Sequence, residues 1–198
     1  MLFNSKFIAA LLAIPGATSS NAADPIDPSN LSLYAYGRNI SGLTVFYGDG
    51  LAYIGSTPLN GVSVASNITF STTDPASETA TWNVTSTNAA FSTTPLLYIV
   101  PTDSAFTQVG FYGSSNNSSL PTGGVTTGFV LFGNYLSYIA SDGTMQQQFW
   151  AQATDTIGTW KLMWNAGGEG GVIADGYTIT PVSIKIRAPL VIDDSATK

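Results

Sequence analysis

The sequence predicts an all-β fold: a mainly antiparallel β-sandwich or jelly roll of about ten strands, forming a single domain. Beyond residue 23, no stretch places apolar residues at helical spacing over three turns, whereas apolar and polar residues alternate with a period of two in several segments. Turn-forming residues, such as Asp-Gly and Asn-Gly pairs, interrupt the chain about every ten residues. With 44% hydrophobic and only 9% charged residues, the chain can form a packed core.

Residues 1–23 have the pattern of a cleaved secretory signal peptide. Lys6 precedes the apolar run Phe7–Ile14, and small residues follow up to Ala23. The run ends at Pro15 and is too short for a membrane-spanning helix, which needs about 20 apolar residues. We therefore expect a secreted protein, extracellular or cell-wall associated, with a β-sandwich domain at residues 24–190. The polar tail at 191–198 lacks the hydrophobic end of a lipid-anchor signal.

The chain also carries sequons for N-linked glycosylation. Each has the form Asn-x-Ser/Thr without a central proline, and behind a signal peptide such a set predicts a glycoprotein. Asn116 and Asn117 are adjacent, so we expect at most one of the two to carry a glycan. The sequons begin at Asn30, Asn39, Asn67, Asn83, Asn116 and Asn117.

Secretion and glycosylation predict a measurable change in mass. Protein secreted from a eukaryotic host is expected to begin near Asp24 and to lose mass when treated with a peptide N-glycosidase. N-terminal sequencing and intact mass spectrometry measure both properties. An intact Met1, or a mass unchanged by the enzyme, would contradict this prediction.

Three segments alternate in the way of strands with one buried face. They are Val62–Phe70, Thr79–Thr85 and Tyr177–Arg187. In the first two, the sequon residues Asn67 and Asn83 fall on the polar face, where a glycan would point outward. The residues expected to face the core are Val62, Val64, Ile68, Phe70, Ala80, Trp82, Val84, Val182, Ile184 and Ile186.

Other segments are apolar on both faces. Pro95–Pro101 and Gly128–Phe132 are therefore predicted to be central strands. Gly42–Ile54 resembles Gly128–Ile139, and each predicts a strand, a tight turn and a second strand. The similarity has two explanations: two hairpins with the same packing needs, or a duplicated half-domain.

Four segments rich in aromatic residues and glycine follow one another along the chain: Tyr34–Gly37, Gly42–Ile54, Gly128–Gly133 and Trp160–Asn165. Their order resembles that in small, cysteine-free secreted glycoproteins of filamentous fungi. The four segments span almost the whole mature chain and consist of packing and turn residues. Because that group has no assigned activity, the resemblance implies secretion and a β fold and leaves the function open.

Composition excludes much of the common enzyme chemistry. The chain has no His and no Cys, so it has no catalytic His, no thiolate or imidazole metal site and no disulfide. The Asp-Gly pairs are explained as turns, and we expect neither a metal nor a cofactor. The net charge is −6 and basic residues are scattered, which argues against nucleic acid or a membrane as partner.

A jelly-roll glycoside hydrolase using Glu78 and Glu169 as its carboxylate pair stays an alternative, although both residues lie in polar or Gly-rich loops.

Trp150 is the main candidate for ligand binding. If residues 145–153 form one strand, Trp150 shares a face with Gln146, Gln148 and Gln152, while Met145 and Phe149 take the other. A flat indole flanked by amides suits the apolar face and the hydroxyls of a sugar ring. Alternatively, a loop or a second sheet covers Trp150. We therefore expect a secreted non-catalytic glycoprotein that binds cell-wall polysaccharide or, as an effector would, a host surface.

Overall fold

The structure is a computed structural model that describes residues 26–55, 59–86, 88, 91–113, 119–167 and 179–189. The expected signal peptide (1–23) and polar tail (191–198) lie outside the described residues. Within them the chain forms fourteen β-strands and no helix, and every strand pair is antiparallel. The predicted all-β, antiparallel class is therefore confirmed. No helix of the described residues has the length and hydrophobicity to cross a bilayer.

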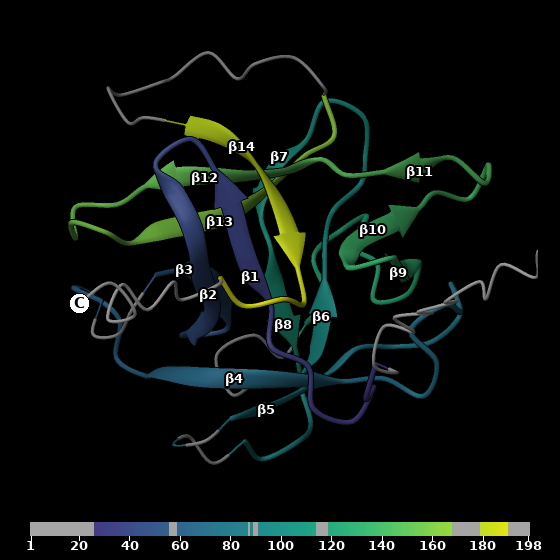
Figure 1. The fold of residues 1–198 in the computed structure, drawn as a ribbon, viewed down its shortest axis with the longest axis horizontal. Coiled ribbons are helices and arrows are strands. Elements are labelled where there is room, and N and C mark those ends of the chain that lie inside the picture. Colours follow the sequence, from purple (N-terminus) through teal and green to yellow (C-terminus); the bar gives the residue numbers. More distant parts are fainter. Residues whose placement is uncertain are drawn as a thin grey trace, which may run out of the picture.

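In chain order the strands are β1 (Tyr34–Gly37), β2 (Ile40–Gly48), β3 (Leu51–Ile54), β4 (Ala65–Ser71), β5 (Asn83–Ser86), β6 (Leu96–Tyr98), β7 (Phe106–Gln108), β8 (Gly110–Tyr112), β9 (Phe129–Phe132), β10 (Tyr135–Ile139), β11 (Met145–Gln146), β12 (Phe149–Ala153), β13 (Trp160–Asn165) and β14 (Ile179–Lys185) (Figure 1).

Ten of these strands close into a barrel, which corrects the predicted sandwich or jelly roll. Their order around the ring is β1-β2-β4-β5-β6-β8-β3-β13-β12-β14, and β14 pairs back with β1. β2 also pairs with β3 across the ring. In Figure 1, β12 and β13 cross one end of the barrel and β4 and β5 the other, with β1, β2, β14, β6 and β8 running between them.

Two long strands change partners and so close the ring. Residues 40–44 of β2 pair with β1, whereas residues 46–48 pair with β4. In β14, residues 179–181 pair with β12 and residues 182–185 with β1. Sandwiches and barrels both bury one face of each strand, so alternation alone does not distinguish them.

Gly42 provides the bend in β2. It is the extra residue of a β-bulge opposite Ala35 and Tyr36, and its φ is 70°. Only glycine adopts such a conformation without steric cost, and a Cβ here would also lie 2.7 Å from the ring of Pro189.

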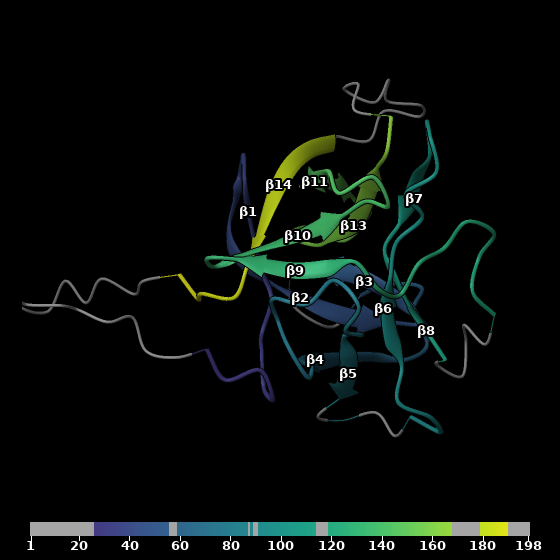
Figure 2. The same cartoon turned by 90° about the vertical axis from the view of Figure 1, so that its right-hand side faces the viewer.

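β9, β10 and β11 lie on one flank of the barrel, the flank that faces the viewer in Figure 2. The prediction of a central strand at Gly128–Phe132 is wrong, because β9 is an edge strand that pairs only with β10 among the described strands. Its free edge is covered by a loop: the Leu131 N–H donates to the Pro75 carbonyl at 2.7 Å. The other predicted central strand is confirmed, since β6 lies between β5 and β8 and Leu97–Val100 are buried.

The barrel interior holds one large apolar core. Of the residues predicted to face it, Ile68, Phe70, Ala80, Trp82, Val84, Val182 and Ile184 are buried, whereas Ile186 is half-buried and packs against the core. Two residues are corrections: Val62 is half-buried and packs against a smaller cluster outside this core, and Val64 is 42% exposed. Val64 precedes β4 in a loop held by Asp49, whose Oδ1 accepts the Val64 N–H at 2.9 Å.

Both predicted hairpins are present. β2 and β3 are joined by Asp49-Gly50 with φ values of 45° and 87°, the positive values required by a two-residue type I′ turn. β9 and β10 are joined by Gly133-Asn134, with Phe132 paired to Tyr135. Phe46 and Phe132 hold equivalent positions in the two similar segments, but Phe46 is fully buried and Phe132 is 64% exposed.

The alternation of β14 gives a prediction for stability. Ile184 is 1% exposed, so Ile184→Ala is expected to lower the free energy of unfolding by about 2–5 kcal/mol. Ser183→Ala, on the opposite face of the same strand, is expected to stay within about 0.5 kcal/mol. Urea denaturation measures both. Equal, small effects would show that β14 contributes little to the core.

Candidate functional site

Trp150 is the second residue of β12, with its side chain on the outside of the barrel. Its neighbours Phe149 and Ala151 are buried in the core, as the alternation predicted. Trp150 is half-buried and belongs to neither apolar cluster of the described residues, whereas the half-buried Trp160 packs against the main core. The cross-strand neighbours of Trp150 are Met163 on β13 and Pro181 on β14.

Of the three predicted glutamines, only Gln152 continues the outer face of Trp150 along β12. Gln146 belongs to β11 and pairs with Tyr138, and the chain leaves the strand conformation at residues 147–148. The Gln148 backbone carbonyl accepts the Asn165 N–H at 2.9 Å, and its side-chain Oε1 is buried without a hydrogen-bond partner among the described residues. Gln152 is half-buried and pairs with Lys161 of β13.

A cavity of about 220 Å³ adjoins Gln152 on this outer face. It lies between the β12–β13 hairpin and the segment that follows β3. Its lining combines an apolar floor with hydroxyl, amide, carboxylate and ammonium groups. The lining residues are Tyr53, Leu59, Asn60, Gln152, Ala153, Thr154, Asp155, Thr156 and Lys161.

Local hydrogen bonds hold the polar side of this cavity in shape. The Thr154 hydroxyl donates to the Thr159 carbonyl at 2.9 Å across the β12–β13 turn. Thr156 Oγ1 accepts the Asn60 N–H at 3.3 Å, which joins this turn to the segment after β3. These two hydrogen bonds restrain the cavity walls in the absence of a ligand.

The apolar floor belongs to a second, smaller cluster outside the barrel. Tyr53 stacks on Phe46 with ring centroids 5.7 Å apart, and Leu59 belongs to the same cluster. Gly48 permits this packing, because a Cβ at its position would lie 2.7 Å from the Tyr53 ring. A ligand with an apolar ring face and several hydroxyl groups would match both the floor and the polar rim.

Glu78 lines a different cavity, of about 500 Å³, near β9 and β10. The Glu78 side chain is exposed, and Glu169 lies outside the described residues. Tyr138 contributes a phenol to this cavity. Burial, and secondarily the charge of Asp142, raises the pKa of Tyr138 above its usual 10.0, so the phenol stays protonated. Hydrogen bonds from Thr144 lower the pKa of Asp142, which keeps that carboxyl group ionised.

The structure describes four of the six sequon asparagines. Asn30, Asn39 and Asn67 are exposed, Asn83 is half-buried, and Asn116 and Asn117 lie outside the described residues. In the described ranges, no group of three or more acidic residues is arranged to hold a metal ion.

Sequence reasoning missed most of the cavity beside Gln152. Tyr53, Leu59 and Asn60 come from a segment about 90 to 100 residues before β12, a separation that no local pattern reveals. The outward position of Gln152 was the one usable signal. Searches of protein-family models, curated proteins and solved structures found no match to this chain.

Proposed function

We propose that this protein is a secreted, non-catalytic glycoprotein that binds polysaccharide through the outer face of β12 and β13. One observation carries the proposal. Trp150, half-buried and outside both apolar clusters, shares a strand face with Gln152, and Gln152 lines the 220 Å³ cavity. Cell-wall polysaccharide and the glycans of a host surface present the same chemistry to such a site.

The site supplies the two kinds of contact that a sugar needs. The half-buried Trp150 indole offers a flat apolar surface for the ring face of a pyranose, and the Tyr53 ring forms part of the apolar floor of the cavity. Gln152, Thr156 and Lys161 supply an amide, a hydroxyl and an ammonium group for its hydroxyls. Residues 150 and 152 of an extended strand are about 7 Å apart, so one ligand can contact both.

A glycoside hydrolase is the alternative, and it is favoured by one observation. Glu78 lines the larger cavity together with Tyr138 and several hydroxyl-bearing residues. Hydrolysis, however, needs a carboxylic acid whose pKa is raised by burial, paired with a second carboxylate. The exposure of Glu78 gives it no such environment, so binding without catalysis is the better proposal.

A pull-down on insoluble polysaccharides tests the two functions together. The secreted full-length protein is incubated with cellulose, chitin and insoluble xylan, and both bound protein and released reducing sugar are measured. Retention on at least one polymer without sugar release is the expected result. Absence of retention on every polymer would contradict the proposal. Sugar release that disappears in Glu78→Gln would establish the hydrolase instead.

A further inference from the structure

Lys185, near the end of β14, lies between two aromatic rings on the outside of the barrel. Its Nζ is 4.8 Å from the ring centroid of Tyr36 and 4.6 Å from that of Tyr135. Tyr36 comes from β1 and Tyr135 from β10, the two strands that flank β14 at this point. Both distances lie within the range of a cation–π interaction.

Strand register and one hydrogen bond set this arrangement. Lys185 is directly opposite Tyr34 on β1 and opposite Tyr135 on β10. Tyr36, opposite Ser183, donates its hydroxyl to the Arg187 carbonyl at 2.8 Å, so its ring lies along β14 beside Lys185. The ammonium group is therefore held in place without a ligand.

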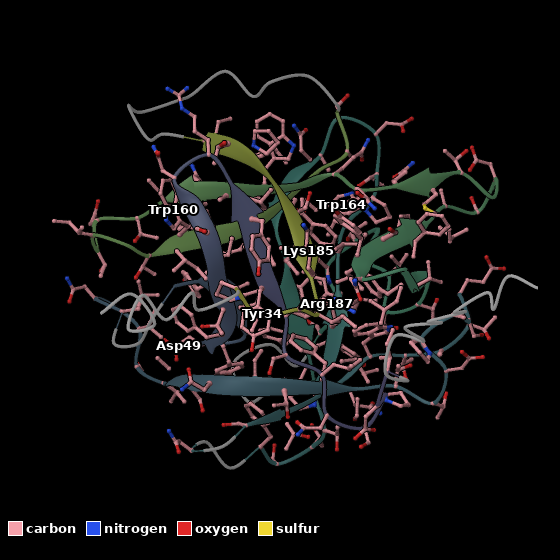
Figure 3. The ribbon with its side chains drawn as sticks, in the orientation of Figure 1. Tyr34, Asp49, Trp160, Trp164, Lys185 and Arg187 are labelled. Atoms are coloured by element: carbon pink, nitrogen blue, oxygen red, sulfur yellow. The ribbon has the colours of Figure 1, made fainter. Side chains whose placement is uncertain are left out.

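The surroundings of Lys185 are exposed and aromatic. Tyr135 is 37% exposed, and Phe132, its partner across the β9–β10 hairpin, is 64% exposed. Arg187 is exposed and adds a second positive charge, and Figure 3 shows it with Lys185 and Tyr34 on the β1 and β14 side of the barrel. We call Tyr36, Phe132, Tyr135, Lys185 and Arg187 the β14 aromatic surface.

We propose that the β14 aromatic surface binds an acidic polysaccharide, a polymer of sugars that carry carboxylate groups. This inference rests on the proposed function and names its substrate class. The exposed rings of Tyr135 and Phe132 take the apolar faces of the sugars. The ammonium of Lys185 binds a sugar carboxylate by charge-assisted hydrogen bonds.

The positive charge of Lys185 is open to such a ligand. Its ammonium has three N–H donors, and cation–π contacts use none of them as hydrogen bonds. In the part of the chain that the structure describes, Lys185 pairs with no carboxylate. A ligand carboxylate therefore supplies the counter-charge that these neighbours do not.

The spacing along β14 indicates a polymer. Trp150 is opposite Pro181, and Lys185 is four residues further along the same strand, a distance of about 13 Å in an extended chain. A single sugar ring cannot span that distance, but a polysaccharide lying along β14 contacts both positions.

The small number of basic residues on this surface argues against nucleic acid as the ligand. Binding to a phosphate backbone needs a row of basic residues that track many charges. The β14 aromatic surface has only two cations, Lys185 and Arg187. Two cations can pair with one or two sugar carboxylates, and stacking on the exposed rings supplies the remaining contacts.

The test compares polygalacturonate with its fully methyl-esterified form, which keeps the sugar ring and removes the charge. Affinity electrophoresis of the full-length protein is expected to give retardation by polygalacturonate that weakens in about 0.5 M NaCl. Lys185→Gln is expected to weaken binding about tenfold or more, while Lys185→Arg retains it. Arg38→Gln, at the β1–β2 turn, changes the net charge equally and is the matched control.

Each outcome decides the matter. Equal retardation by the charged and esterified polymers, or equal losses in Lys185→Gln and Arg38→Gln, would overturn the inference. If the protein binds neutral polymers through Trp150 but does not bind polygalacturonate, the inference is wrong and the proposed function stands. If no polysaccharide is bound, both fall. Should Lys185→Gln fail to fold in a thermal melt, the salt dependence and the ester comparison on the unaltered protein still decide.

Discussion

Trp150→Ala is expected to abolish retention on polysaccharide while leaving the fold almost intact. The indole lies outside both apolar clusters of the described residues, so its removal leaves no cavity in the core. We expect a loss of at most about 1 kcal/mol, or about 2–4 °C in Tm for a chain of this size. Stacking provides most of the affinity of a weak sugar site, so binding should fall below detection. Pull-down and differential scanning calorimetry measure the two effects.

Trp160→Ala is the matched control. Trp160 is also half-buried, but it packs against the main core and pairs with Ile54 and Ala153. Its loss should lower Tm clearly and spare binding in the fraction that stays folded. A fall in Tm of about 10 °C or more in Trp150→Ala would identify Trp150 as part of the core instead. A stable Trp150→Ala protein that binds as well as wild type would also exclude the site.

Trp82→Ala is expected to have the largest effect on stability, about 3–5 kcal/mol, with a fall in Tm of about 10 °C or more. Trp82 is fully buried and packs against Phe70 with ring centroids 6.4 Å apart. Its Nε1 donates to the Phe129 carbonyl at 3.2 Å, which ties the segment before β5 to β9. Truncation leaves a cavity and also removes the donor to that carbonyl.

Trp82→Phe separates these two contributions. Phenylalanine keeps most of the buried volume and lacks the N–H, so a loss of about 1–3 kcal/mol is expected. Chemical denaturation of the three proteins gives the comparison. A loss below about 1 kcal/mol in Trp82→Ala would contradict the position of this residue in the core.

The barrel core was largely predictable because burial imposes a period of two on each strand. That period placed Trp82, Ile184 and Phe149 inward, and all three are buried. The turns were predictable for a similar reason: Asp49-Gly50 needs two positive φ values, which few residue pairs accept. The rule failed at Val64, because the strand begins at Ala65, three residues after the predicted start at Val62, and a hydrogen bond to Asp49 holds the loop.

The candidate sites were only partly predictable. Alternation placed Trp150 and Gln152 on one outer face, but the interruption at residues 147–148 removes Gln146 and Gln148 from that row. Tyr53 and Lys185 acquire their neighbours through pairing between strands that are far apart in the chain. Short patterns do not contain that information.

The sequence by itself determined an all-β chain, the inward face of most strands and the positions of two hairpin turns, because these follow from the local conformational preferences of a few consecutive residues. Only the tertiary structure decided that β14 pairs first with β12 and then with β1, which closes a barrel and excludes two separate sheets. It also decided that Lys185 lies between Tyr36 and Tyr135. Strand partners are selected by the packing of the whole core, a property of all the strands together.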